Sequence, residues 1–78
     1  MKTMTCNQLG GACDLEFTAE SFEEIAEMSK KHGMEMFAQN DTPHLDAMHK
    51  MKKLGAEPGA FDKWIADRKA DFDALPHT

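Results

Sequence analysis

The 78-residue sequence contains no tyrosine, only two cysteines, and no long apolar run. A membrane-spanning helix requires about 18 consecutive apolar residues, and no segment approaches that length, so we expect no membrane association. Residues 1–6 also lack the apolar run of a secretory signal peptide. We therefore expect a cytoplasmic protein. In a reducing compartment, two cysteines are more often free thiols, metal ligands or redox groups than a structural disulfide.

Basic side chains are also scarce, since 9 lysines and arginines stand against 14 acidic residues and give a formal net charge of −5. Nucleic-acid affinity depends on neutralising phosphates with lysine and arginine, so we expect no nucleic-acid partner. An apolar fraction of 41% and a charged fraction of 29% are typical of a folded globular chain. Residues 1–78 are therefore predicted to form one small domain, in which a metal or another staple would add needed stability.

The familiar patterns of catalysis are missing too. We find no Ser/His/Asp set, no glycine-rich phosphate loop before a helix, and no paired carboxylates in an evident cleft. A chain of this length with one core leaves little volume for a substrate pocket. We therefore predict a non-enzymatic protein, and the sequence does not identify the cellular process in which it acts.

Two short runs near the N-terminus alternate between apolar and polar residues, which predicts half-buried strands near residues 2–6 and 13–18. Between them, Gly10 and Gly11 permit the positive φ angles of a chain reversal, so the two runs are expected to form a β-hairpin. One face of this hairpin carries Lys2, Met4, Cys6, Cys13, Leu15 and Phe17. We expect this face to pack against helices, because an isolated hairpin is only marginally stable.

Three helices should follow, near residues 21–37, 42–54 and 58–75. Ser21 and Glu24 form a capping box at the start of the first helix. Thr42 is the expected cap of the second helix, and Pro43 its first helical residue. Pro58 should begin the third helix. Gly33 either ends the first helix or is passed through to about Phe37.

These elements predict an α+β fold in which an N-terminal hairpin packs on three helices in the order ββααα. Apolar residues at helical and strand spacing define the expected core. Its members are Met4, Leu15, Phe17, Phe22, Ile25, Met28, Leu45, Leu54, Phe61, Trp64 and Ile65.

Cys6, Cys13 and His32 form the one candidate site with a specific chemistry. Six residues separate the cysteines, which flank the hairpin turn and are expected to face the helices. His32 falls on the apolar stripe of the first helix. Two thiolates from a hairpin and an imidazole from the next helix form the ligand arrangement of a ββα zinc site.

Two segments and one histidine resemble the pattern of a known family. They are residues 4–14 (MTCNQLGGACD), residues 20–25 (ESFEEI) and His32. With them, residues 1–37 resemble the family of predicted small metal-binding proteins, domain of unknown function 1059. The resemblance implies that Cys6, Cys13 and His32 are metal ligands. It also implies that residues 1–37 are a ββα metal-binding-like unit, to which residues 42–75 add a helical hairpin.

The chain departs from that family at Phe37, where a second histidine commonly follows the first by five residues. A structural zinc site needs four ligands, so the fourth ligand is open. The candidates are His44, Met36, Glu35, Asp14 and water. His44 shares a helix face with Met48, and His49 lies nearby. Methionine thioethers at Met34 and Met36 beside His32 would instead suit Cu(I).

Other functions fit the same residues. The helical hairpin from Leu45 to Leu75 can present apolar surface to a second copy or to another protein, and we expect a homodimer. Cys6 and Cys13 can instead oxidise to a disulfide and act as a thiol–disulfide switch. A third alternative is that both cysteines are small buried apolar residues without chemistry.

Overall fold

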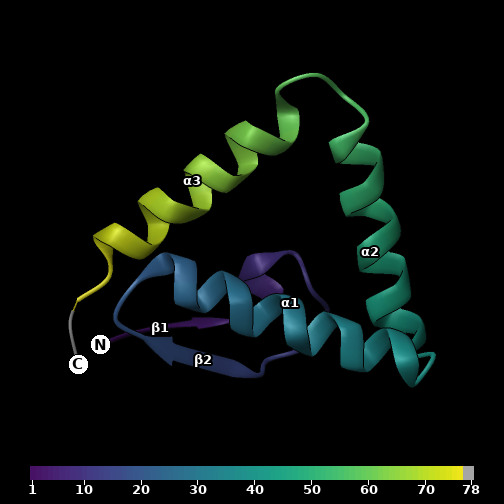
Figure 1. Cartoon of the computed structure of the whole chain (residues 1–78), viewed down its shortest axis with the longest axis horizontal. Helices are drawn as coiled ribbons and strands as arrows, with labels where there is room; N and C mark the ends of the chain where they lie inside the picture. Colours follow the sequence, from purple (N-terminus) through teal and green to yellow (C-terminus); the bar gives the residue numbers. More distant parts are fainter. Residues whose placement is uncertain (77–78) are drawn as a thin grey trace.

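The computed structural model describes residues 1–76. Within the first 20 residues, where apolar and polar side chains alternate, the chain forms an antiparallel hairpin (Figure 1). Strand β1 (Lys2–Thr5) pairs with strand β2 (Glu16–Ala19). The register places Met4 opposite Phe17, and both side chains are buried. The hairpin and three following helices confirm the predicted α+β fold with the order ββααα.

The second strand is shorter than predicted and begins three residues later. The Cys6 N–H donates to the Leu15 carbonyl at 2.8 Å, in register with the strands, but the Asn7 N–H donates to the Cys13 carbonyl at 2.9 Å. The pairing therefore shifts by one residue at this point, because Asp14 is passed over. As a result Cys13 lies in the loop rather than in a strand. The loop also contains a short 3₁₀ turn, η1 (Asn7–Leu9).

Helix α1 (Phe22–Ala38) begins at the predicted cap. The Ser21 hydroxyl oxygen accepts a hydrogen bond from the Glu24 N–H at 3.3 Å. The Glu24 carboxylate accepts from the Ser21 hydroxyl at 3.1 Å, which closes the local pair of hydrogen bonds. The helix passes through Gly33 and ends one residue beyond Phe37, in agreement with the longer of the two predicted ends.

Helix α2 (Thr42–Gly55) is capped by Asp41, one residue before the predicted cap. Helix α3 (Ala60–Ala74) begins two residues after Pro58. The Ala60 N–H donates to the Glu57 carbonyl at 3.2 Å, and Gly59 has a φ of 76°. Proline followed by a left-handed glycine is the signature of a type II turn, so Pro58 forms the turn before the helix instead of its first residue.

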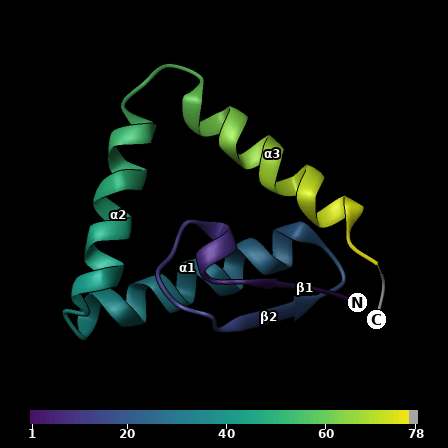
Figure 2. The same ribbon diagram turned by 180° about the vertical axis from the view of Figure 1, so that it is seen from behind.

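The three helices run along the sides of a triangular outline, with the hairpin beside α1 (Figure 1). Seen from behind, the loop between the strands turns toward the space that the helices border (Figure 2). A Cβ at Gly10 would lie 3.0 Å from Sδ of Met51 and 3.1 Å from Cζ2 of Trp64. The loop therefore touches α2 and α3 where it turns, and the φ of 88° at Gly10 suits only glycine well. None of the helices described is long and apolar enough to span a bilayer.

The core lies between the hairpin, α1 and the C-terminal end of α3. Its buried members are Met4, Cys6, Phe17, Ala19, Phe22, Ile25 and Phe72. The Phe72 ring packs edge-to-face on Phe22, with centroids 6.1 Å apart. The Lys2 ammonium lies 5.0 Å above the Phe72 ring and donates to the Asp73 carbonyl at 3.0 Å. These contacts hold the end of α3 against the first strand.

Several predicted core residues are confirmed and others are wrong. Met4, Phe17, Phe22 and Ile25 are buried, and Leu45, Leu54, Trp64 and Ile65 are half-buried. Leu15, Met28 and Phe61 are exposed, at 48%, 40% and 41%. Leu15 precedes the shortened strand. The first turn of α3 lies away from the sheet, so Phe61 stacks on Trp64 at 6.1 Å instead of entering the core.

Replacing Ile25, which is fully buried, by alanine should lower the free energy of unfolding by about 2–5 kcal/mol through lost burial and a residual cavity. The matched change Phe61→Ala should cost about 1 kcal/mol, because much of that ring already faces water. Urea unfolding followed by circular dichroism measures both. Equal losses in the two variants would contradict this description of the core.

Candidate metal centre

Four side chains from separate segments of the chain meet between the hairpin loop, α1 and α2. They are Cys6 at the end of β1, Cys13 in the loop, His32 on α1 and His44 on α2. One potential ligand atom from each residue lies within 4.8 Å of the ligand atoms of the other three. The structure thus brings together the three residues predicted from the sequence and one of the candidates for the fourth position.

The sulfur–nitrogen distances match those of a tetrahedral zinc centre. Sγ of Cys6 is 3.6 Å from Nε2 of His44, and Sγ of Cys13 is 3.3 Å from Nε2 of His32. Zn–S bonds of about 2.3 Å and Zn–N bonds of about 2.0–2.1 Å separate adjacent ligands in a tetrahedron by about 3.5 Å. The four atoms can therefore surround one ion without a large movement of the backbone.

The chain wraps closely around Cys6. The N–H groups of Leu9 and Gly11 donate to the Cys6 carbonyl at 3.0 and 2.9 Å. The backbone amides of Cys13 and Ala12 act to lower the pKa of the Cys6 thiol. A Cβ at Gly11 would lie only 2.1 Å from that sulfur, so no other residue fits beside it. The Gly10–Gly11 pair, expected only to allow a chain reversal, therefore also leaves room for a ligand atom.

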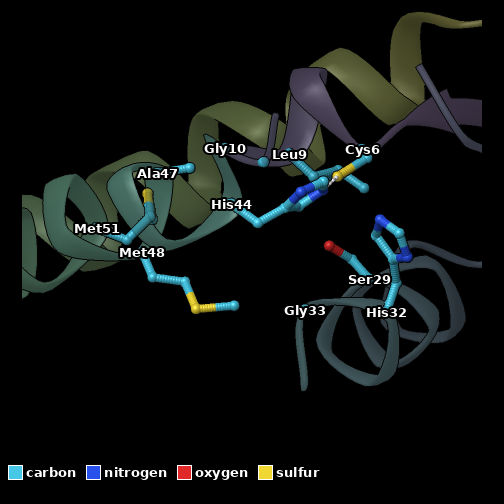
Figure 3. Close-up of a pocket in the computed structure, with 11 residues that line it drawn as sticks. Cys6, Leu9, Gly10, Ser29, His32, Gly33, His44, Ala47, Met48 and Met51 are labelled. Carbon is cyan, nitrogen blue, oxygen red and sulfur yellow. Dashed lines mark hydrogen bonds between the residues drawn. The ribbon is translucent and has the colours of Figure 1, made fainter. Parts of the chain in front are cut away.

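Asp41 determines the orientation of His44. The Asp41 carboxylate accepts from the His44 backbone N–H at 3.2 Å, as the cap of α2, and hydrogen-bonds to Nδ1 of the same residue. This leaves Nε2 directed at Cys6 (Figure 3). Histidine ligands in metal sites commonly bind a carboxylate through the other ring nitrogen. Asp41 was not predicted from the sequence, although an aspartate three residues before a histidine at a helix start is a visible signal.

His32 is held by ring contacts. Its imidazole packs edge-to-face on Phe17, with centroids 5.8 Å apart, and on His44, with centroids 5.1 Å apart. Its Nε2 faces Cys13. Within residues 1–76, no hydrogen-bonding group faces its Nδ1, in contrast to the carboxylate at His44.

The two thiols differ in their tendency to ionise. Burial raises the pKa of Cys6, although hydrogen bonds from the Cys13 and Ala12 amides partly oppose it. Burial also acts to raise the pKa of Cys13, but the Leu15 amide, His44 and the Cys6 thiol outweigh it and lower that pKa. A divalent cation placed between the two sulfurs would compensate the cost of a buried thiolate at Cys6, since metal ligation deprotonates a thiol.

The remaining candidates for the fourth ligand lie outside the cluster. Asp14 is exposed and accepts from the Asn7 side-chain amide at 2.7 Å. Glu35 is exposed on α1, and Met36 is half-buried one turn beyond His32. Phe37, where the resembled family has its second histidine, is 63% exposed. Two further residues considered for metal binding, Met34 and His49, are also exposed.

A cavity of about 220 Å³ adjoins the cluster (Figure 3). Cys6, His32 and His44 form one side of it, whereas Cys13 does not line it. The other walls are Leu9, Gly10, Gly11, Ser29, Gly33, Ala47, Met48 and Met51. One side of the four-ligand cluster thus faces open space, and the opposite ligand is Cys13.

Substituting Gly11 by alanine should disturb the cluster more than the fold, because the added methyl group would overlap the Cys6 sulfur. We expect metal affinity to fall by at least about tenfold, comparable to the loss of a ligand-supporting contact. The matched control is Gly55→Ala, at a position with nothing within 4 Å. Competition with a chromophoric chelator measures both affinities. Equal affinity in the two variants would contradict the close packing at Cys6.

The Asp41–His44 pair should make the stability of the metal-free protein depend on pH. The pairing raises the pKa of His44 above 6.5, so its contribution is full below that value and is lost as pH rises through the raised pKa. The pKa of Asp41 is lowered below 3.8 by the same hydrogen bond, so its contribution is lost as pH falls through the lowered value. The contribution is therefore largest at mildly acidic pH.

Asp41→Asn tests this, because asparagine remains a good helix cap but carries no charge. Unfolding midpoints measured in chelator between pH 4 and 8 should separate wild type and variant most below pH 6.5, and progressively less as the pH rises through the raised pKa of His44. A constant difference across this range would show that the pair does not titrate as described.

No family model, curated protein or solved structure matches this chain. The resemblance of residues 1–37 to the predicted metal-binding family therefore stays a prediction, and the functional argument depends on the geometry of the chain's own side chains. That geometry is a cluster of two cysteines and two histidines that could hold a metal ion.

Proposed function

We propose that this protein is a small, non-enzymatic metal-binding protein that holds one Zn²⁺ ion through Cys6, Cys13, His32 and His44. The observation that carries the proposal is the placement of four nitrogen and sulfur ligand atoms within 4.8 Å of one another. Chance rarely brings such atoms together, because they come from the two ends of the hairpin loop, from α1 and from α2.

The ligand types favour zinc over other common ions. Two sulfur and two nitrogen donors in tetrahedral reach suit Zn²⁺, whereas Mg²⁺ and Ca²⁺ require oxygen ligands. Two thiolates would also balance the double positive charge of the ion. The thioether at Met34, which was considered for Cu(I), is 60% exposed and thus does not add to the cluster.

A metal here would also stabilise the fold. It would join the hairpin loop to α1 and α2, which otherwise share few buried side chains, since His44 is the buried residue of α2. Structural zinc contributes about 10 kcal/mol or more of apparent binding free energy in small domains. The whole free energy of unfolding of a domain of this size is about 5–10 kcal/mol. The core around Ile25, in which Cys6 packs with six apolar residues, supports the expectation that the metal-free chain still folds.

One alternative use of the same residues has a specific observation behind it. Cys6, His44 and Asp41 are connected in the order of a nucleophile, a base and an orienting carboxylate. Burial nevertheless raises the pKa of Cys6, which opposes the thiolate that such a reaction needs. The arrangement also leaves Cys13 and His32 without a role. A thiol–disulfide switch between the two free cysteines accounts for Cys13 but not for the histidines. Metal binding uses all four residues.

The test is the metal content of protein purified without chelator or affinity metal. Native mass spectrometry and elemental analysis should find one zinc per chain, and the native mass also reports a homodimer if one forms. Cys6→Ser combined with Cys13→Ser should abolish binding and lower the melting temperature. His49→Ala, an exposed histidine on the same helix as His44, is the control and should retain full metal content.

Metal-free wild-type protein that takes up no zinc, together with an equally stable double variant, would contradict the proposal. Asp41→Asn should weaken zinc binding without abolishing it. It leaves all four ligands in place but removes the charged partner of His44, so zinc affinity should fall by about 10–100-fold. An unchanged affinity in this variant would show that His44 does not bind the ion.

A further inference from the structure

The four ligands are not equally well supported. The backbone at both cysteines is held by hydrogen bonds, since the Cys6 carbonyl accepts two N–H groups of its own loop and the Cys13 carbonyl accepts the Asn7 N–H. His44 is fixed by Asp41. His32 has only ring packing, and within residues 1–76 its Nδ1 faces no hydrogen-bonding group. Outer contacts of this kind hold a ligand in place and raise its basicity, so His32 is the ligand most readily released.

The cavity adjoins His32 together with Cys6 and His44. Its volume of about 220 Å³ opens on the side formed by Cys6, His32 and His44, opposite Cys13. In Figure 3 the imidazole of His32 stands at the edge of the cavity, and the Ser29 hydroxyl, one turn earlier on α1, points into it. A site that serves only to staple a fold is closed by its ligands and needs no adjoining space.

We propose that His32 is a displaceable ligand and that the cavity admits a small apolar thiol, whose sulfur takes the place of His32 on the metal. This inference rests on the proposed function, because it requires a bound ion. In the exchange, the sulfur–metal bond forms, the bond between the metal and Nε2 of His32 breaks, and the thiol proton leaves to solvent. No electrons are transferred.

The three ligands that remain define a known kind of centre. Cys6, Cys13 and His44 would form a set of two thiolates and one imidazole, which is found in zinc sites that keep a fourth position for an exogenous ligand. In such a site, an incoming donor binds without dismantling the others. The supported ligands are the same three that would have to stay.

The walls of the cavity favour a thiol over a charged ligand. Leu9, Ala47, Met48 and Met51 make most of its side-chain lining apolar, and no lysine or arginine lines it. A carboxylate would enter such a space at a high desolvation cost. A thiol enters as a neutral molecule and ionises only on the metal. Among the described residues that line the cavity, Ser29 is the one outside the ligands whose hydroxyl can hydrogen-bond to the bound sulfur.

The experiment uses the full chain loaded with Co²⁺, which occupies zinc sites and reports its ligands by visible and near-ultraviolet absorption. Before any thiol is added, the spectrum of tetrahedral thiolate-bound Co²⁺ tests the proposed function by itself. Titration with 1-propanethiol should then increase the sulfur-to-cobalt absorption to saturation at one thiol per ion. A tetrahedral spectrum that does not respond to thiol would overturn the inference and leave the proposed function standing.

Two variants locate the thiol. His32→Ala should retain Co²⁺, unlike His44→Ala, and should bind 1-propanethiol at least tenfold more tightly, because no ligand has to be displaced. Ala47→Leu fills the cavity and should weaken thiol binding at least tenfold with little change in the spectrum before titration. Ala66→Leu, an exposed position on α3, is the matched control and should behave as wild type.

Three outcomes would overturn the inference. The first is loss of all cobalt bands with added thiol, which means that the thiol removes the ion. The second is equal thiol affinity in Ala47→Leu and in Ala66→Leu. The third is loss of metal from His32→Ala as complete as from His44→Ala. If Ala47→Leu does not fold by circular dichroism, Ser29→Leu fills the same cavity from α1 and replaces it in the comparison.

Discussion

The packing of one loop, residues 6–15, against all three helices is the constraint on which the rest of the structure depends. Gly10 brings this loop against Met51 of α2 and Trp64 of α3. Cys13 reaches His32 of α1 from the same loop. Because the sheet has only two strands, it covers little of the helices itself, and the loop supplies the contact that a third strand would otherwise make. The helices are thus arranged around irregular backbone.

Irregular backbone in such a place requires its polar groups to be satisfied locally. The Cys6 carbonyl accepts the N–H groups of Leu9 and Gly11 from its own loop. The hydrogen bonds that make the loop compact therefore also fix the backbone of a ligand residue. On the α2 side of the site, the Asp41 carboxylate accepts the His44 backbone N–H in the first turn of the helix. The same carboxylate hydrogen-bonds to the His44 ring and orients it. In both places, the group that completes the local structure also prepares the site, so fold and site are hard to separate.

The sequence was sufficient for the parts of this fold that depend on local signals. Ser21 and Glu24 predicted the start of α1, and helical spacing placed His32 on its inward face. The shift at Asp14 was not predictable, because it depends on how the loop hydrogen-bonds to Cys6 and Asn7. Phe61 was misassigned because an apolar residue at helical spacing does not reveal which end of α3 reaches the sheet. His44 could be named as a candidate, but its selection over Met36 required the angle at which α2 leaves α1.

The linkage between Cys6 and His44 has a consequence for how the molecule comes apart. A bound ion would tie together positions 38 residues apart, and such a cross-link restricts the unfolded chain in the manner of a disulfide. The segment inside the linkage contains β2, α1 and the start of α2, whereas β1 and α3 lie wholly outside it. Helix α3 is attached through Phe72 and the Lys2–Asp73 hydrogen bond near its C-terminal end, and through Trp64 where the loop turns at Gly10. A bound ion would therefore restrict residues 6–44 directly and α3 only indirectly, so we expect α3 to detach at a lower free energy than the cross-linked segment unfolds.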